Sequence, residues 1–155
     1  MGGNQGNREA NLTRARELIR QRCGVILKSS AIYETAAWGN EQQPPFLNQA
    51  LQVETELSAI EVLRTILGIE QEIGRVRKER FGPRSIDIDL LLYDDDIHDS
   101  RELTIPHPRL HLRRFVLVPL SEIAAETMHP LLHLSVRELL EKCPDELEVR
   151  EWGRN

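Results

Sequence analysis

The run of residues 84–93 constrains the fold more than any other stretch, because polar and apolar residues alternate in it before it turns fully apolar. This alternation predicts a β-strand, on which residues two apart share a face at roughly 6.5 to 7 Å. Asp87 and Asp89 then project side by side, while Ile86 and Ile88 face a core. Two such carboxylates repel unless a cation lies between them, and without one a carboxyl is pushed toward its protonated form. The pair therefore indicates a divalent-cation site with oxygen ligands.

A basic segment, residues 74–84, leads directly into this acidic run. It opens with Gly74 and closes with Gly82-Pro83 before Arg84. Guanidinium groups bind phosphate oxygens in pairs, and carboxylates bind Mg²⁺, so the combination favours a metal-bound polyphosphate ligand. The alternative is a solvated charged turn before a strand whose aspartates face water.

Composition limits the class of protein. A chain of 155 residues is expected to form one domain, residues 1–155. The net charge of -5 argues against a general nucleic-acid binder. Cys23 and Cys143 lie far apart without metal-site spacing, which predicts free thiols in a reducing compartment. No apolar run approaches the ~20 residues of a membrane span and no signal peptide is recognisable, so we expect a soluble cytoplasmic protein that binds no membrane.

Helical periodicity and capping residues predict helices over residues 8–22, from Ser58 to Gly74, over 121–125 and from Ser135 to 141. Strands are predicted over residues 25–35, 46–55 and 84–93, with a further strand in the tail, 146–152.

Three polar stretches receive simple structural interpretations. Residues 2–7 are glycine-rich but lack the Lys-Ser/Thr of a Walker A motif, so they predict a tight turn before a helix. Residues 94–96 predict a solvated acidic turn. His129 and His133 have helix-like spacing but no acidic or cysteine partner, which favours surface histidines over metal ligands.

Phe46 and Asn48 share one face of their predicted strand. An aromatic ring and an amide placed this way can stack on and hydrogen-bond a flat heterocycle with several donors and acceptors. The alternative is an edge-strand amide that faces water. Trp38 lies on a polar loop, where it is either an anchor over a ligand or a side chain folded back onto the core.

The segment 80–89, Arg-Phe-Gly-Pro-Arg-Ser-Ile-Asp-Ile-Asp, resembles the signature of the 6-hydroxymethyl-7,8-dihydropterin pyrophosphokinase family, and the resemblance continues through residues 105–108 and 113–117. It implies transfer of pyrophosphate from ATP to a pterin alcohol, giving AMP and the pterin diphosphate in folate synthesis. Several apolar residues normally precede the glycine-rich turn in this family, whereas only Met1 does here, so we expect a first strand that is largely absent. The order of elements then predicts an α+β, ferredoxin-like sandwich with an antiparallel sheet and an extra C-terminal helical or hairpin segment.

The resemblance also implies roles for individual residues. Those implied in catalysis are Arg75, Arg84, Asp87 and Asp89, with Asp87 and Asp89 holding two Mg²⁺ ions. Those implied in ATP binding are Glu70, Arg77, Lys78, Arg84, Thr104, His107 and Arg113. Those implied around the pterin are Thr35, Ala37, Trp38, Phe46, Asn48 and Phe115, with Phe46 and Phe115 sandwiching the ring.

One position departs from the family pattern, because Glu102 stands where some members carry an arginine that contacts phosphate. Arg101 next to it either substitutes for that arginine or faces away. The loops around Trp38 and Arg80 are expected to close after ATP binds.

The expected partners are ATP and the pterin, with no nucleic acid or membrane, and the chain is expected to be a monomer or weak dimer. Two other functions remain open. One is a non-catalytic relative that binds Mg-nucleotide without turning it over, and the other is a nucleotidyl transferase that releases pyrophosphate instead of AMP.

Overall fold

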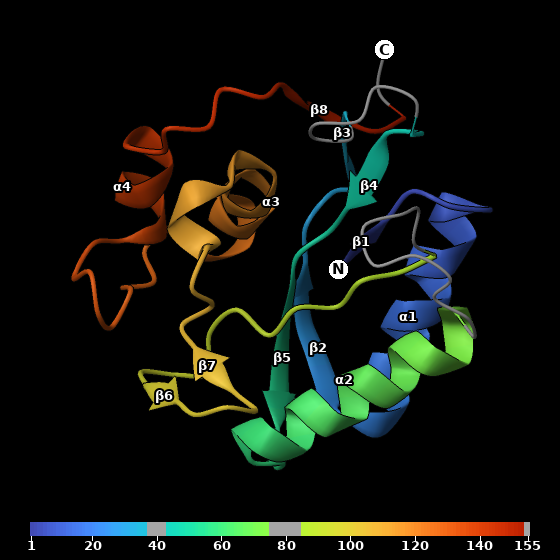
Figure 1. Ribbon diagram of the computed structural model, residues 1–155, viewed down its shortest axis with the longest axis horizontal. Coiled ribbons are helices and arrows are strands. Elements are labelled where there is room, and N and C mark those ends of the chain that lie inside the picture. The colour runs from blue at the N-terminus through green and yellow to red at the C-terminus, as the bar shows by residue number, and fades with distance from the viewer. Residues whose placement is uncertain (37–42, 75–84, 154–155) are drawn as a thin grey trace.

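A computed structural model of the chain describes residues 1–36, 43–74 and 85–153 and shows an α+β architecture (Figure 1). Its strands are β1 (Gly2–Gly3), β2 (Gly24–Ser29), β3 (Tyr33–Thr35), β4 (Phe46–Asn48), β5 (Leu51–Thr55), β6 (His98–Asp99), β7 (Thr104–Ile105) and β8 (Val149–Glu151). Its helices are α1 (Arg8–Arg22), α2 (Ala59–Gly74), the 3₁₀ turn η1 (Leu110–Leu112), α3 (Arg114–Ala124) and α4 (Val136–Glu141).

All strand pairs in the described chain are antiparallel. One sheet has the order β1-β4-β3-β8, while β2 pairs with β5 and β6 with β7. The predicted strands 25–35 and 46–55 are each divided in two, because side chains interrupt the ladder between them. Ala50 N–H donates to Ser30 Oγ at 2.9 Å, and Gln49 Nε2 donates to the Ser30 carbonyl at 2.7 Å. The antiparallel architecture predicted from the sequence is confirmed.

Two groups of helices pack against these strands (Figure 1). Helices α1 and α2 lie side by side and bury Leu12, Ile66 and Ile69 in a core that Leu47 of β4 completes. Helices α3 and α4 form a second core with η1 around Leu117, which is fully buried. The strands β3 and β4 therefore lie between two groups of helices, each of which has its own hydrophobic core.

The helix ends follow the capping residues. Asn7 accepts from the Ala10 N–H at 3.0 Å and begins α1, and Ser58 accepts from the Glu61 N–H at 3.3 Å before α2. Ser135 and Glu138 form a complete capping box at α4. The predictions of these three helices are confirmed, as is a C-terminal strand, which is β8.

The predicted strand over residues 84–93 is wrong as a regular strand. Within the described chain, Asp87 forms an isolated bridge with Gly2, with N–H···O distances of 2.8 and 2.6 Å, and no ladder follows. The neighbouring strand β1 is only two residues long, in agreement with the prediction of a first strand that is largely absent. For this reason β1 pairs with a single residue of the segment. The alternation nevertheless holds, because Ile86 and Ile88 are buried while Asp89 is exposed.

Two further predictions need correction. Helix α3 begins at Arg114 rather than near residue 121, because the apolar run before Ser121 is itself helical and carries Pro119 inside the helix. His129 is 4% exposed rather than on the surface. Its Nδ1 accepts from the N–H groups of Leu131 and Leu132 at 3.2 and 3.0 Å, so the ring satisfies the backbone of its own turn. His133 is exposed as predicted.

No described helix has the length and apolar character needed to cross a bilayer. Both cysteines are free thiols, and burial raises the pKa of Cys23.

Candidate functional site

A cavity of about 1660 Å³ extends along β3, β4 and β5 and is bounded by the segment after Ser85, the start of α3, part of α2 and the segment before β8. It exceeds the roughly 300 to 1,000 Å³ of an ordinary small-molecule pocket and therefore has room for two substrates. The predicted site residues that line it are Thr35, Phe46, Asn48, Asp87, Asp89, Arg113 and Phe115.

Strands β3 and β4 form the wall predicted to receive the heterocycle. Phe46 and Asn48 share one face of β4, and Leu47 between them turns into the core with 1% exposure. Thr35 stands directly opposite Phe46 across the β3–β4 pair. The sequence prediction that an aromatic ring and an amide share a strand face is confirmed.

Two polar atoms on this wall are buried without a partner. Within the described chain, Thr35 Oγ1 and Asn48 Nδ2 make no hydrogen bond. Leaving a buried polar atom unpaired costs about 1 to 3 kcal/mol, so such atoms are uncommon unless a ligand or water satisfies them. Their position on the cavity wall fits a ligand that carries both donors and acceptors.

Gly2 lies between this wall and the acidic segment. It pairs with Asn48 of β4 on one side and with Asp87 on the other. A Cβ at Gly2 would lie 2.1 Å from Asn48 Oδ1 and 2.9 Å from the Leu47 carbonyl oxygen, so the close approach requires glycine.

The acidic segment carries the candidate metal ligands. Asp87 is half-buried and Asp89 exposed, and both line the cavity. Glu70 Oε2 on α2 accepts from the N–H of Ile88, the residue between them, at 2.7 Å. The described residues contain no cluster of three or more metal-ligating side chains. Two carboxylates on an open cavity nevertheless suit Mg²⁺, which takes its other ligands from water and substrate phosphates.

Arg113 and Phe115 enter the cavity from the start of α3, and the Arg113 guanidinium carbon lies 5.7 Å from the centroid of the Phe115 ring. His107 lies nearby, held by its main-chain N–H to the Leu91 carbonyl at 2.9 Å and by its Nδ1, which accepts from the Arg109 N–H at 3.2 Å. Burial lowers the pKa of His107, and attraction to Asp89 opposes the shift only in part. The imidazole is therefore neutral near pH 7, with its proton on Nε2.

Other predicted residues lie outside the cavity or outside the described chain. Glu70, Thr104 and His107 are not among the described residues that line it, and Thr104 is exposed on β7. Six predicted residues fall outside the described ranges, namely Ala37, Trp38, Arg75, Arg77, Lys78 and Arg84.

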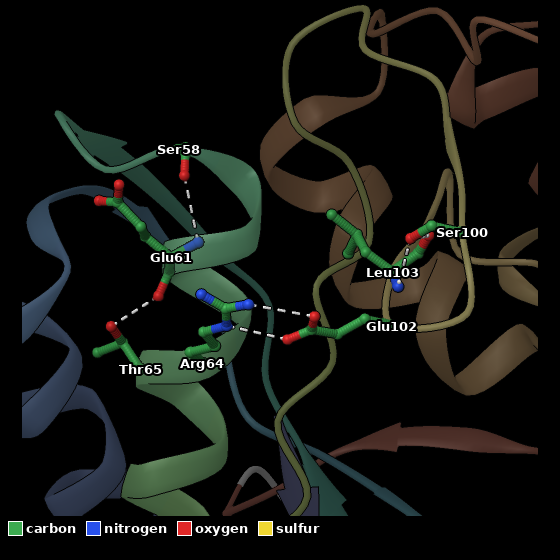
Figure 2. A network of polar contacts seen from close by, with 7 residues as sticks. All are labelled: Ser58, Glu61, Arg64, Thr65, Ser100, Glu102 and Leu103. Carbon is green, nitrogen blue, oxygen red and sulfur yellow. Dashed lines mark hydrogen bonds and ion pairs between the residues drawn. The ribbon is translucent and has the colours of Figure 1, made fainter.

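Glu102 is paired with Arg64 of α2 (Figure 2). The Arg64 Nε and Nη2 atoms donate to the two carboxylate oxygens at 2.9 and 3.3 Å, and this interaction lowers the pKa of Glu102. Ser100 Oγ stabilises the same turn, because it donates to the Leu103 carbonyl and accepts from the Leu103 N–H. Glu102 therefore joins α2 to the turn before β7, and Arg101 beside it is exposed.

The sequence analysis missed two residues that hold the strand entering the cavity wall. Arg8 Nη1 donates to Glu34 Oε2 at 2.8 Å and to the Pro45 carbonyl at 2.9 Å. Asn4, which is 1% exposed, donates to the Pro44 carbonyl at 3.1 Å. The glycine-rich segment predicts only a tight turn and residues 8–22 only a helix, so neither pattern carries a signal for these contacts.

The sequence profile described as 7,8-dihydro-6-hydroxymethylpterin-pyrophosphokinase (HPPK) matches residues 1–125. The 2-amino-4-hydroxy-6-hydroxymethyldihydropteridine pyrophosphokinase of Bacillus subtilis is 42% identical over 127 residues, which are 81% of this chain and 76% of that protein. The Aquifex aeolicus protein of the same name is 39% identical over 138 residues, 89% of this chain and 86% of the relative.

Two longer proteins contain a similar part. The folic acid synthesis protein fol1 of Schizosaccharomyces pombe is 38% identical over 94% of this chain, which spans only 20% of that protein. A crystal structure of HPPK-DHPS in complex with substrates superposes with a TM-score of 0.69 at 16% identity, covering 91% of this chain and 42% of the other. At this identity the structural match supports the fold alone.

Proposed function

The chain belongs to the 7,8-dihydro-6-hydroxymethylpterin-pyrophosphokinase family, and on that premise we propose that it transfers pyrophosphate from ATP to 6-hydroxymethyl-7,8-dihydropterin. The pterin hydroxyl oxygen forms a bond to the β-phosphorus while the bond to the oxygen bridging the α- and β-phosphorus breaks. AMP leaves with that oxygen, the hydroxyl proton passes to solvent, and the other product is the pterin diphosphate used in tetrahydrofolate synthesis.

The observation that carries the proposal is one cavity with two chemically different walls. One wall offers an aromatic ring and two unpartnered polar atoms, the other offers two carboxylates, and Arg113 lines the same cavity. A pterin alcohol and a metal-bound triphosphate need these two surfaces within reach of each other, because positioning supplies a large part of the catalysis of phosphoryl transfer.

Phe46 on the first wall and Phe115 from α3 stack on opposite faces of the pterin ring. Asn48 Nδ2 donates to a ring acceptor and Thr35 Oγ1 bonds a second polar atom of the ring, which satisfies both buried atoms. Ala37 and Trp38 border the same ligand in the proposal.

On the second wall, Asp87 and Asp89 would hold two Mg²⁺ ions. When bound, these ions would neutralise phosphate charge and make the pterin hydroxyl more acidic. Arg113 adds a cation for the phosphates, and neutral His107 donates from Nε2. The remaining proposed nucleotide contacts are Glu70, Arg75, Arg77, Lys78, Arg84 and Thr104, with Arg75 and Arg84 also stabilising the transferring group.

We further propose that residues 1–155 form one domain, which acts in the cytoplasm as a monomer or weak dimer. Its two substrates are ATP and the pterin, whereas Trp38 and Arg80, whose loops the resemblance expects to close, lie outside the described residues.

The test is an assay of AMP in the presence of ATP, Mg²⁺ and 6-hydroxymethyl-7,8-dihydropterin, with Asp87→Ala and Asp89→Ala as site variants. Asp95→Ala is the matched control, because Asp95 is exposed in the turn that follows. We expect AMP formation that requires the pterin, is unchanged in the control and falls by orders of magnitude in both site variants. A folded wild-type protein that binds MgATP and forms no AMP would show a non-catalytic relative.

A further inference from the structure

The start of α3 depends on a residue from the far end of the chain. The backbone is extended at Arg113, and α3 follows from Arg114, with no side chain of the N-cap residue bonding the first turn. The first N–H groups of a helix have no partner within the helix, and α3 leaves the Arg114 N–H to be satisfied from elsewhere. Asp145 Oδ2 accepts this N–H at 3.0 Å.

The Asp145 side chain is itself held in place. Its second oxygen, Oδ1, accepts from the Leu147 N–H at 3.0 Å, so the carboxylate is fixed by its own turn while it caps α3. A carboxylate at this end of a helix also interacts favourably with the helix dipole. Figure 1 shows the segment that carries Asp145 as it passes from α4 to β8, and pairing of β8 with β3 anchors its far end.

This contact lies between two residues that enter the cavity, Arg113 just before α3 and Phe115 in its first turn. Arg114, whose N–H Asp145 accepts, stands between Arg113 and Phe115 in the chain. The body of α3 is fixed by Leu117, which is fully buried, so the first turn is the part whose position depends on the cap. Pro144, Asp145 and Leu147 line the same cavity as Phe115.

We propose that Asp145 is a positioning residue that holds Arg113 and Phe115 in the geometry required for the two substrates. It acts as a hydrogen-bond acceptor for the α3 backbone and contacts neither substrate itself. The profile match ends at residue 125, so this role belongs to the part of the chain outside it. The inference rests on the proposed function for its catalytic consequence, whereas its structural part stands on the contact alone.

Two substitutions remove the Asp145 acceptors stepwise. Asp145→Asn keeps one accepting oxygen for the N–H groups of Arg114 and Leu147, because the amide nitrogen cannot accept, and Asp145→Ala removes both acceptors. Glu148→Ala is the control, because Glu148 is exposed in the same segment and its nearest described ion-pair partner, Arg150, is 3.6 Å away.

The first measurement is hydrogen exchange at the Arg114 amide without ligands. Loss of a helix cap predicts exchange about 5- to 10-fold faster in Asp145→Ala, with Asp145→Asn between this variant and wild type and Glu148→Ala close to wild type. Unchanged exchange in Asp145→Ala would overturn the cap whether or not the wild-type protein forms AMP. If Asp145→Ala does not fold, Asp145→Asn decides, and exchange as slow as in wild type at both the Arg114 and the Leu147 amides contradicts the acceptor role.

The second measurement is steady-state kinetics of AMP formation. We expect Asp145→Ala to raise the KM for the pterin about 5- to 10-fold, with kcat changed less and a smaller rise of KM in Asp145→Asn. An unchanged KM in Asp145→Ala would contradict the positioning role. Absence of AMP from the wild-type protein contradicts the proposed function instead and leaves the exchange result to decide on Asp145.

Discussion

The two walls of the cavity are built in different ways. The wall formed by β3 and β4 is part of a four-stranded sheet, so ladder hydrogen bonds fix Thr35, Phe46 and Asn48. The acidic segment forms no ladder in the described chain and is held by individual contacts, among them the bridge of Asp87 to Gly2 and the bond from the Ile88 N–H to Glu70. Main-chain pairing therefore determines the geometry of one wall, whereas individual contacts determine that of the other.

This difference predicts where substitutions act. Changes to the strand wall should alter the affinity for the pterin, and changes around the acidic segment should alter the response to Mg²⁺ and the rate.

The largest effect is expected from Asp87→Asn and Asp89→Asn, which keep side-chain size and remove charge. Loss of one charge-stabilising group commonly costs about 10²- to 10³-fold in kcat, and we expect at least that loss in each variant. Kinetics at saturating ATP over a range of Mg²⁺ concentrations measures it. Near-wild-type kcat in either variant would remove that residue from the metal site.

The next largest effect is expected from Gly2→Ala, because Gly2 touches both walls. The new Cβ would lie 2.1 Å from Asn48 Oδ1, so the amide must move. We expect the KM for the pterin to rise about tenfold or more, the equivalent of about 1.4 kcal/mol. Gly68→Ala is the matched control, since a Cβ there meets no atom within 4 Å and alanine favours the helix.

A smaller effect is expected at Glu70, where a substitution tests how much its contact with the Ile88 N–H contributes to the position of the acidic segment. Glu70→Ala removes the acceptor for the Ile88 N–H, and Glu70→Gln keeps one. We expect the Mg²⁺ concentration for half-maximal rate to rise several-fold in the alanine variant and less in the glutamine variant. Equal changes in both variants would instead assign Glu70 a role through its charge.

The smallest effect concerns stability at acidic pH, far from the reacting atoms. Burial lowers the pKa of His129 below its ordinary value. The unfolded chain then binds more protons than the folded one as pH falls through about 6.5, so the free energy of unfolding decreases there. Urea unfolding at several pH values should show a weaker decrease in His129→Asn, whose amide oxygen can still accept from Leu131 and Leu132. An equal decrease in the wild-type protein and in His129→Asn would contradict this assignment.

The sequence predicted side-chain faces better than backbone pairing. Alternation correctly placed Ile86 and Ile88 in the core and put Phe46 and Asn48 on one face, because burial follows the side-chain period. It did not predict that the acidic run lacks a ladder, since pairing depends on whether a neighbouring strand is long enough. Capping residues fixed the limits of α1 and α4 because a cap acts locally.

The contacts that the sequence could not predict are long-range. Asn4, Arg8 and Asp145 each bind a main-chain group far away in the sequence, and none belongs to a local pattern. The prediction that His129 lies on the surface failed although its partners are local. They are the main-chain N–H groups of Leu131 and Leu132, and a main-chain group gives no signal in the sequence.

The central claim is that one cavity binds both substrates so that pyrophosphate passes from ATP to the pterin. The most direct test is to follow the ³¹P spectrum of wild-type protein with ATP, Mg²⁺ and 6-hydroxymethyl-7,8-dihydropterin. We expect AMP and a diphosphate ester of the pterin to accumulate in equal amounts, and neither to form without the pterin. Free pyrophosphate together with a nucleotidylated pterin, or no pterin-dependent change in ATP, would contradict the account.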